Sequence, residues 1–201
     1  VIDHFVPSPS EAYSGLQKAT RDFAREMGAI LIDEGEGICH QVLLERGYIR
    51  PGMVVPGADS HACIYGGVNA FGTGVGSTDM AAVLATGKMW CRVPESVRLV
   101  LHGRLRAGTT AKDLMLHLIG DMTADGANYQ AVEFAGEAAA ALTIGELCTI
   151  SNMAVEMAAK AGIFGKTMSS KLTGPVLVNE ASRKRGSKSA CSREFKWIGM
   201  V

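Results

Sequence analysis

Residues 57–80 read Gly-Ala-Asp-Ser-His-Ala-Cys-Ile-Tyr-Gly-Gly-Val-Asn-Ala-Phe-Gly-Thr-Gly-Val-Gly-Ser-Thr-Asp-Met. The stretch places an acid, a hydroxyl and an imidazole side by side in Asp59, Ser60 and His61, and then brings glycine at positions 66, 67, 72, 74 and 76. Because glycine costs backbone entropy, such density in an ordered region indicates a chain that turns sharply or lets a ligand approach its backbone. The stretch is therefore predicted to be an active-site loop.

The bulk composition narrows the class of protein. Twenty basic and twenty acidic residues give the 201-residue chain a formal net charge of zero, which argues against a nucleic-acid partner. The sequence holds no run of about 18 apolar residues, so no membrane-spanning helix is expected. Five cysteines at irregular spacing, an odd number, fit reduced thiols in the cytoplasm better than a disulfide framework.

Hydrophobic periodicity predicts helices alternating with strands. Helices are expected over 10–27, 42–45, 78–90, 110–119 and 143–161, and strands over 29–32, 51–57, 96–105 and 130–134. This alternation predicts an α/β architecture with a largely parallel sheet. Ligands of such sheets bind beyond the carboxyl ends of strands, which is where Asp59 would lie. Ser10 is expected to cap the first helix, and the helix over 78–90 is expected to be buried because it carries few charges.

The roles of two histidines outside this stretch, His4 and His40, are ambiguous from their neighbours in the sequence. An acid next to a histidine, as in Asp3-His4, can orient or charge the imidazole, but such a dipeptide is usually a surface pair. His40 taken alone is better interpreted as a core histidine, and Cys39 beside it as a packing residue. The sequence alone leaves both alternatives open.

The remaining polar residues exclude two familiar kinds of site. Asp59, Ser60 and His61 cannot form a hydrolase triad, because adjacent side chains point in different directions and no nucleophile elbow surrounds Ser60. The glycines match neither a phosphate-binding loop nor a dinucleotide fingerprint. Asn152 and Glu156 are four residues apart, which would place both on one face of an otherwise apolar helix.

Several motifs occur together in a recognisable order. Asp59-Ser60-His61, Tyr65-Gly66-Gly67 and the run Gly74-Val75-Gly76-Ser77-Thr78-Asp79 resemble the aconitase superfamily, and within it the 3-isopropylmalate dehydratase large subunits, with homoaconitases next. The resemblance extends from residue 1 to about 164. It implies a three-layer α/β/α catalytic domain over 1–164, followed by a tail of uncertain structure over 165–201. That domain is expected to be incomplete relative to the family.

The resemblance also implies an activity. It is that of a hydro-lyase, which interconverts 2-isopropylmalate and 3-isopropylmalate in leucine biosynthesis by dehydration and rehydration. A homoaconitase or another aconitase-type hydratase is the alternative. The expected substrate is a small carboxylic acid, and the expected partner is a small subunit that carries a swivelling domain and supplies the base.

Roles for individual residues follow from the same resemblance. The Asp3–His4 pair would protonate the leaving hydroxyl group. His40 would be hydrogen-bonded to Asp59, and His61 would be positioned by Glu156. Two more side chains would complete the substrate site, Ser60 as a carboxylate contact and Asn152.

One expected feature of the family is missing from the sequence. The resembling enzymes hold a [4Fe–4S] cluster through cysteines in a Cys-Thr-Asn motif and a Cys-x-x-Cys motif, and neither motif occurs here. No residue is therefore assigned as a metal ligand. The chain alone is expected to show no dehydratase activity, and an alternative of another class is a non-catalytic fragment or subunit-interaction domain.

Overall fold

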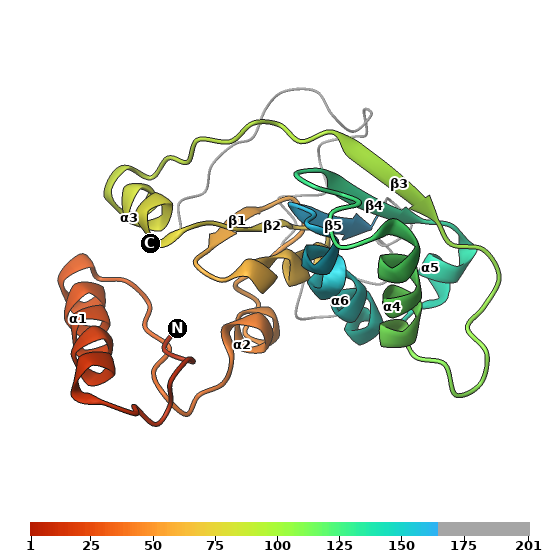
Figure 1. Ribbon diagram of the computed structural model, residues 1–201. Helices are drawn as coiled ribbons and strands as arrows, with labels where there is room; N and C mark the ends of the chain where they lie inside the picture. Colours follow the sequence, from red (N-terminus) through yellow and green to blue (C-terminus); the bar gives the residue numbers. More distant parts are fainter. Residues whose placement is uncertain (165–201) are drawn as a thin grey trace.

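The computed structural model describes residues 1–164, which form helices and short strands (Figure 1). The predicted tail over 165–201 lies outside the described residues. The α-helices are α1 (Glu11–Met27), α2 (Cys39–Glu45), α3 (Ser77–Thr86), α4 (Ala111–Met122), α5 (Glu137–Ala141) and α6 (Ile144–Met153). Two 3-10 helices are η1 (Ser60–Val68) and η2 (Ala154–Met157). The strands are β1 (Val54–Gly57), β2 (Phe71–Gly74), β3 (Ser96–Val100), β4 (Ala131–Ala135) and β5 (Ala161–Phe164).

The strands form two parallel sheets. One pairs β1 with β2, with Val54 opposite Phe71, and the other has the order β3-β4-β5 with β4 in the centre. Helices lie between successive strands of the larger sheet, as parallel pairing requires. The expected α/β class with parallel sheets is thereby confirmed.

The main core lies between the larger sheet and helices α4 and α6. Alternation along β4 turns Val132 and Phe134 inward, where they are fully buried. Phe134 stacks on Phe164 of β5 with 5.2 Å between ring centroids. Met115 of α4 and Leu147 of α6 close this core, and neither has any exposed surface. Figure 1 shows α4 and α6 next to each other on one side of this sheet.

The glycine-rich stretch is not a loop: it folds into a closely packed 3-10 helix and a strand. Its residues form η1 and β2, and η1 is buried from Ala62 to Val68. A Cβ atom built on Gly66 would collide with the carbonyl oxygen of Gly162, and one on Gly67 would lie 2.7 Å from the Cα of Cys148. The glycines here let η1 approach the backbones of β5 and α6. The predicted active-site loop is wrong in its conformation, because the close approach is made by the protein's own backbone.

Several predictions for the first third of the chain need correction. Helix α1 has the predicted extent, but the Ser10 side chain makes no capping hydrogen bond. The apolar side chains of α1 are largely open to solvent, with Leu16 65% exposed. The expected strand over 29–32 does not form; this segment is extended without sheet pairing, and its one buried residue, Ile32, accepts a backbone hydrogen bond from Ile2.

Two predicted helices were too long. Helix α3 ends at Gly87, which takes a left-handed conformation, and none of its residues is buried, contrary to expectation. The helix predicted over 143–161 is three elements, since α6 gives way to η2 and the chain then turns at Ala158 into β5. Strand β5 is short and rich in small residues, so periodicity gave no signal for it.

Candidate active site

Asp59 is the centre of a cluster of acids and histidines. It follows β1 and caps η1, because its Oδ1 accepts the backbone N–H of His61 at 2.7 Å. This cap fixes the carboxylate so that Oδ1 lies 3.2 Å from Nε2 of His40 and Oδ2 lies 3.5 Å from Nε2 of His4. Oδ1 also lies 3.7 Å from Nδ1 of His61, so one carboxylate faces histidines from three segments of the chain.

His40 lies at the closed end of the cluster, with 13% of its side chain exposed. Its burial lowers the pKa of the imidazole, against the attraction of Asp59, so the ring is neutral at pH 7. Nδ1 lies 3.4 Å from the Sγ of Cys39, whose pKa burial raises to about 12. The protonated thiol can thus donate to Nδ1, which leaves Nε2–H to donate to Asp59. Cys39 therefore does more than pack: its position favours the tautomer that bonds Asp59.

Asp3 ties the start of the chain to this end of the cluster. Its Oδ2 accepts the backbone N–H of Cys39 at 2.6 Å and so caps α2, whose own N-cap residue, Ile38, has no side-chain acceptor. Its Oδ1 lies 2.9 Å from Nδ1 of His4. Burial opposes ionisation of Asp3, but the bonds from Cys39 and His4 outweigh it and lower the pKa of the carboxyl group.

His4 is more accessible to solvent than His40. The hydrogen bond to Asp3 raises the pKa of its imidazole, aided by the charge of Asp59 and opposed by slight burial. Its side chain is 56% exposed. His4 is thus an imidazole with a stabilised proton that a molecule outside the cluster can reach.

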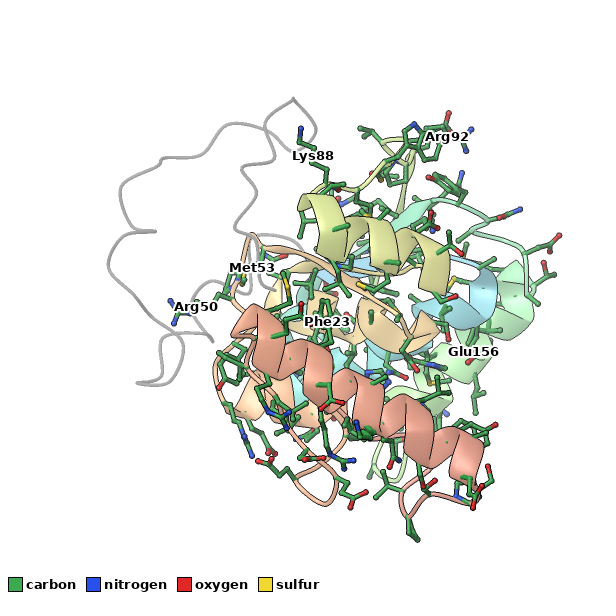
Figure 2. All side chains as sticks on the ribbon, turned by 90° about the vertical axis from the view of Figure 1, so that its left-hand side faces the viewer. Phe23, Arg50, Met53, Lys88, Arg92 and Glu156 are labelled. Carbon is green, nitrogen blue, oxygen red and sulfur yellow. The ribbon has the colours of Figure 1, made fainter. Side chains whose placement is uncertain are left out.

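His61 and Glu156 form the open side of the cluster. Nε2 of His61 lies 3.3 Å from Oε1 of Glu156, across 95 residues of sequence, and its Nδ1 lies 3.3 Å from the hydroxyl oxygen of Ser60. Glu156, labelled in Figure 2, comes from η2 and is 53% exposed on its side chain. The contact of His61 with Glu156 and that of His40 with Asp59 are those which the resemblance implied.

Asn152 is not joined to this cluster by any hydrogen bond within residues 1–164. It lies on α6, and its backbone carbonyl accepts a hydrogen bond from the Cys63 thiol at 3.1 Å. Glu156 lies beyond the end of that helix, in η2, which winds about three residues per turn. The single helix expected to carry both Asn152 and Glu156 is therefore wrong, because it is divided between α6 and η2.

Two residues of the cluster's framework were missed by sequence reasoning. The spacing of Cys39 in the sequence suggests no role for it, yet its backbone N–H donates to Asp3 and its thiol contacts His40. Tyr65, 3% exposed, donates its hydroxyl hydrogen to the Cys39 carbonyl oxygen at 3.3 Å. No sequence signal marks the bonds of Cys39 with Asp3 and with Tyr65, because they join segments that only the fold brings together.

The cysteines of the described chain do not fit an iron–sulfur cluster. Within residues 1–164, no three histidine, cysteine or carboxylate side chains are arranged so that they could hold a metal ion. Cys63 and Cys148 are both buried, burial raises the pKa of their thiols to about 12 and about 11, and neither belongs to such an arrangement.

Comparison with known proteins places this arrangement in a family. The sequence matches the aconitase family (aconitate hydratase) over residues 4–171, and the chain belongs to that family. It is 54% identical over 163 residues to the 3-isopropylmalate dehydratase large subunit 2 of Archaeoglobus fulgidus, a match that covers 81% of this chain and 39% of that protein. It is 51% identical over 164 residues to the probable methanogen homoaconitase large subunit of Methanothermobacter thermautotrophicus, covering 81% of this chain and 38% of that protein.

Two further findings concern the length of the chain relative to its relatives and its helices. It spans about two fifths of the length of the curated relatives it matches. Within residues 1–164, no helix has the length and apolar character needed to cross a membrane.

Proposed function

We propose that residues 1–164 form the acid–histidine wall of a hydro-lyase active site, and that the whole enzyme interconverts 2-isopropylmalate and 3-isopropylmalate. The observation that carries the proposal is the convergence of His4, His40 and His61 on Asp59. Family membership and the similarity to a 3-isopropylmalate dehydratase large subunit support it.

Elimination of water from a hydroxy acid needs a base that removes a proton beside a carboxylate and an acid that protonates the leaving hydroxyl group. His4 suits the second task, because its raised pKa keeps a proton on the ring and its exposure lets a substrate reach it. Asp3 stabilises the charged imidazole and holds Nδ1, so that Nε2 is the atom that gives up the proton.

The remaining residues orient this proton and the substrate. Neutral His40 donates to Asp59 and keeps its carboxylate in place beside His4. Ser60 presents an exposed hydroxyl group as a donor to a substrate carboxylate, and the Glu156–His61 pair fixes the ring next to it. Asn152 stays a proposed substrate contact.

The rest of the machinery lies outside this part of the chain. We propose that the base comes from a small subunit with a swivelling domain. A [4Fe–4S] cluster supplies a Lewis acid when bound, and its ligands would have to come from outside residues 1–164, since the described cysteines do not fit one. Free thiols at Cys39, Cys63, Cys91 and Cys148 support a cytoplasmic location.

The test uses a chimera, in which residues 1–164 replace the matching segment of the Archaeoglobus fulgidus large subunit. With its small subunit, the chimera is expected to form the unsaturated acid from 2-isopropylmalate, measured by ultraviolet absorbance. His4→Gln should lower kcat by about 100-fold or more, and Lys112→Gln, on the exposed face of α4, should not change it. Asp3→Asn should move the pH limb of kcat that belongs to His4 to lower pH.

A folded chimera in which His4→Gln keeps the full rate would contradict the role of His4. A folded but inactive parent chimera would favour the alternative that these residues serve only a structural or subunit-binding role. Comparison of kcat/KM for 2-isopropylmalate and for a homoaconitase substrate separates the proposal from its runner-up, which the similar identities of the two relatives do not.

A further inference from the structure

Helix α1 contacts the rest of the chain mainly through polar side chains. Tyr13, Gln17, Arg21 and Ala24 follow one another at helical spacing, and each is buried or half-buried. Gln17 is 9% exposed, although glutamine is mostly exposed in proteins. Arg21 bonds both carboxylate oxygens of Asp33 at 2.7 to 3.0 Å. Because hydrogen bonds are directional, these contacts fix where α1 lies.

Gln17 bonds the residue that follows His4 in the chain. Its Nε2 donates to the backbone carbonyl oxygen of Phe5 at 3.0 Å, across 12 residues of sequence. The Phe5 ring stacks on Tyr13, with 4.1 Å between the ring centroids. Two successive turns of α1 therefore hold Phe5, one by its backbone and the other by its ring.

The backbone of Phe5 is strained. Its φ is 54°, in the left-handed region that a bulky residue rarely adopts. Such a conformation costs free energy and persists only where the surrounding contacts impose it, which is most common at functional sites. The bond from Gln17 and the stack on Tyr13 are contacts that can impose it here.

The chain before His4 is anchored as well. The backbone N–H of buried Ile2 donates to the carbonyl oxygen of Ile32, and Asp3 caps α2. His4 thus lies between an anchored segment and a strained turn, with Nδ1 2.9 Å from Asp3 and Nε2 3.5 Å from Asp59. A change of backbone conformation directly after His4 would move its ring relative to Asp59.

We propose that Gln17 is a positioning residue for His4: by holding the Phe5 carbonyl group, it keeps the left-handed turn that places the imidazole beside Asp59. Without this bond the turn relaxes and the ring leaves Asp59, while α1 stays docked through Arg21. The inference rests on the proposed function for what the His4 proton does. Its first readout is a histidine titration, which does not depend on turnover.

The test replaces Gln17 by methionine, which has a similar length and a high helix propensity but no N–H donor. NMR titration of the 201-residue chain follows His4, whose signal is assigned with His4→Gln. The groups that face this ring are the carboxylates of Asp3 and Asp59 and the imidazole of His40. Because the two carboxylates raise the pKa of His4, we expect that pKa to fall toward 6.5 in Gln17→Met.

The same variant is then measured in the chimera. We expect kcat to fall about tenfold with KM for 2-isopropylmalate unchanged, because a displaced acid slows proton transfer without removing the Ser60 contact. Gln41→Met is the matched control. It makes the same substitution at an exposed side chain that bonds Glu45, and it should leave both kcat and the pKa of His4 unchanged.

A double-mutant cycle with Phe5→Gly separates positioning from packing. Glycine adopts the left-handed conformation without strain, so the turn then needs no bond to impose it. In the Phe5→Gly background, Gln17→Met should therefore lower kcat by less than about threefold and leave the pKa of His4 raised.

An unchanged pKa of His4 in Gln17→Met would overturn the inference. An equal loss of kcat in both backgrounds would also overturn it, because Gln17 would then act by docking α1 and not through the turn at Phe5. The same holds for a Gln17→Met chain that folds in neither background. A lowered pKa of His4 together with full kcat in the folded chimera would instead contradict only the proposed function.

Discussion

Gly66 offers the most direct test of why the motif is rich in glycine. It lies in η1, where an added Cβ would collide with the Gly162 carbonyl oxygen of β5 and lie 3.3 Å from the Ser151 Oγ of α6. The obstacle is backbone on a buried strand, which cannot rotate away. Overpacking of a core costs about 1–3 kcal/mol and occasionally more, so we expect Gly66→Ala to lower the free energy of unfolding by at least about 3 kcal/mol.

Thermal and urea unfolding of the 201-residue chain measure this change. At about 2–4 °C per kcal/mol for a chain of this size, the melting temperature should fall by about 6–12 °C. Gly120→Ala is the matched control, because Gly120 lies in α4 with nothing within 4 Å of an added Cβ; its stability should rise by up to about 1 kcal/mol. If Gly66→Ala melts within 2 °C of the parent (roughly 1 kcal/mol or less), η1 does not need a glycine in order to pack closely against β5, and this explanation of the motif is wrong.

Two further substitutions and one titration test the core and the cluster. Ser151→Ala removes a fully buried hydroxyl group without a partner in the described chain, and should leave urea stability unchanged or raise it by about 1 kcal/mol; a clear loss would reveal a bond to that hydroxyl. Phe134→Ala, at a side chain 1% exposed, should cost about 3–5 kcal/mol in the same assay, and a loss below 1 kcal/mol would contradict the placement of the core. NMR titration should place the pKa of His4 above 6.5 and that of His40 below it. His4 then stabilises the fold below pH 6.5 and loses that contribution as pH rises through its raised pKa. His40 stabilises the fold above pH 6.5 and loses that contribution as pH falls through its lowered pKa. The reverse order of the two pKa values would refute the assigned partners.

The sequence carried good information about regular elements with strong periodicity. Helix α4 was predicted nearly in full, because its apolar residues recur at helical spacing; the structure adds a capping box at its start, formed by Thr110 and Asp113. The strand predicted over 130–134 corresponds closely to β4. Strands β2 and β5 escaped prediction, since Gly72, Gly74 and Gly162 give them no alternating side chains to detect.

The site shows a similar division. Its residue types followed from motifs and from the resemblance, and the structure brings Asp59 and the histidines together. What could not be predicted is the support around them: Asp3 capping a helix 36 residues away, or the Tyr65 hydroxyl group bonding the Cys39 carbonyl oxygen. Such bonds depend on tertiary approach, and local sequence does not encode them.

The long separation between His61 and Glu156 sets an order of events during synthesis. When a ribosome has made the chain through Ile150, Asp59 and the histidines already exist, but η1 still lacks β5, the strand against which Gly66 packs. Contacts between distant segments form only after the entropy of closing the intervening loop has been overcome. The nascent chain therefore exposes the apolar surface of η1 until residue 164 has emerged. We expect chaperones to recognise this surface during that interval.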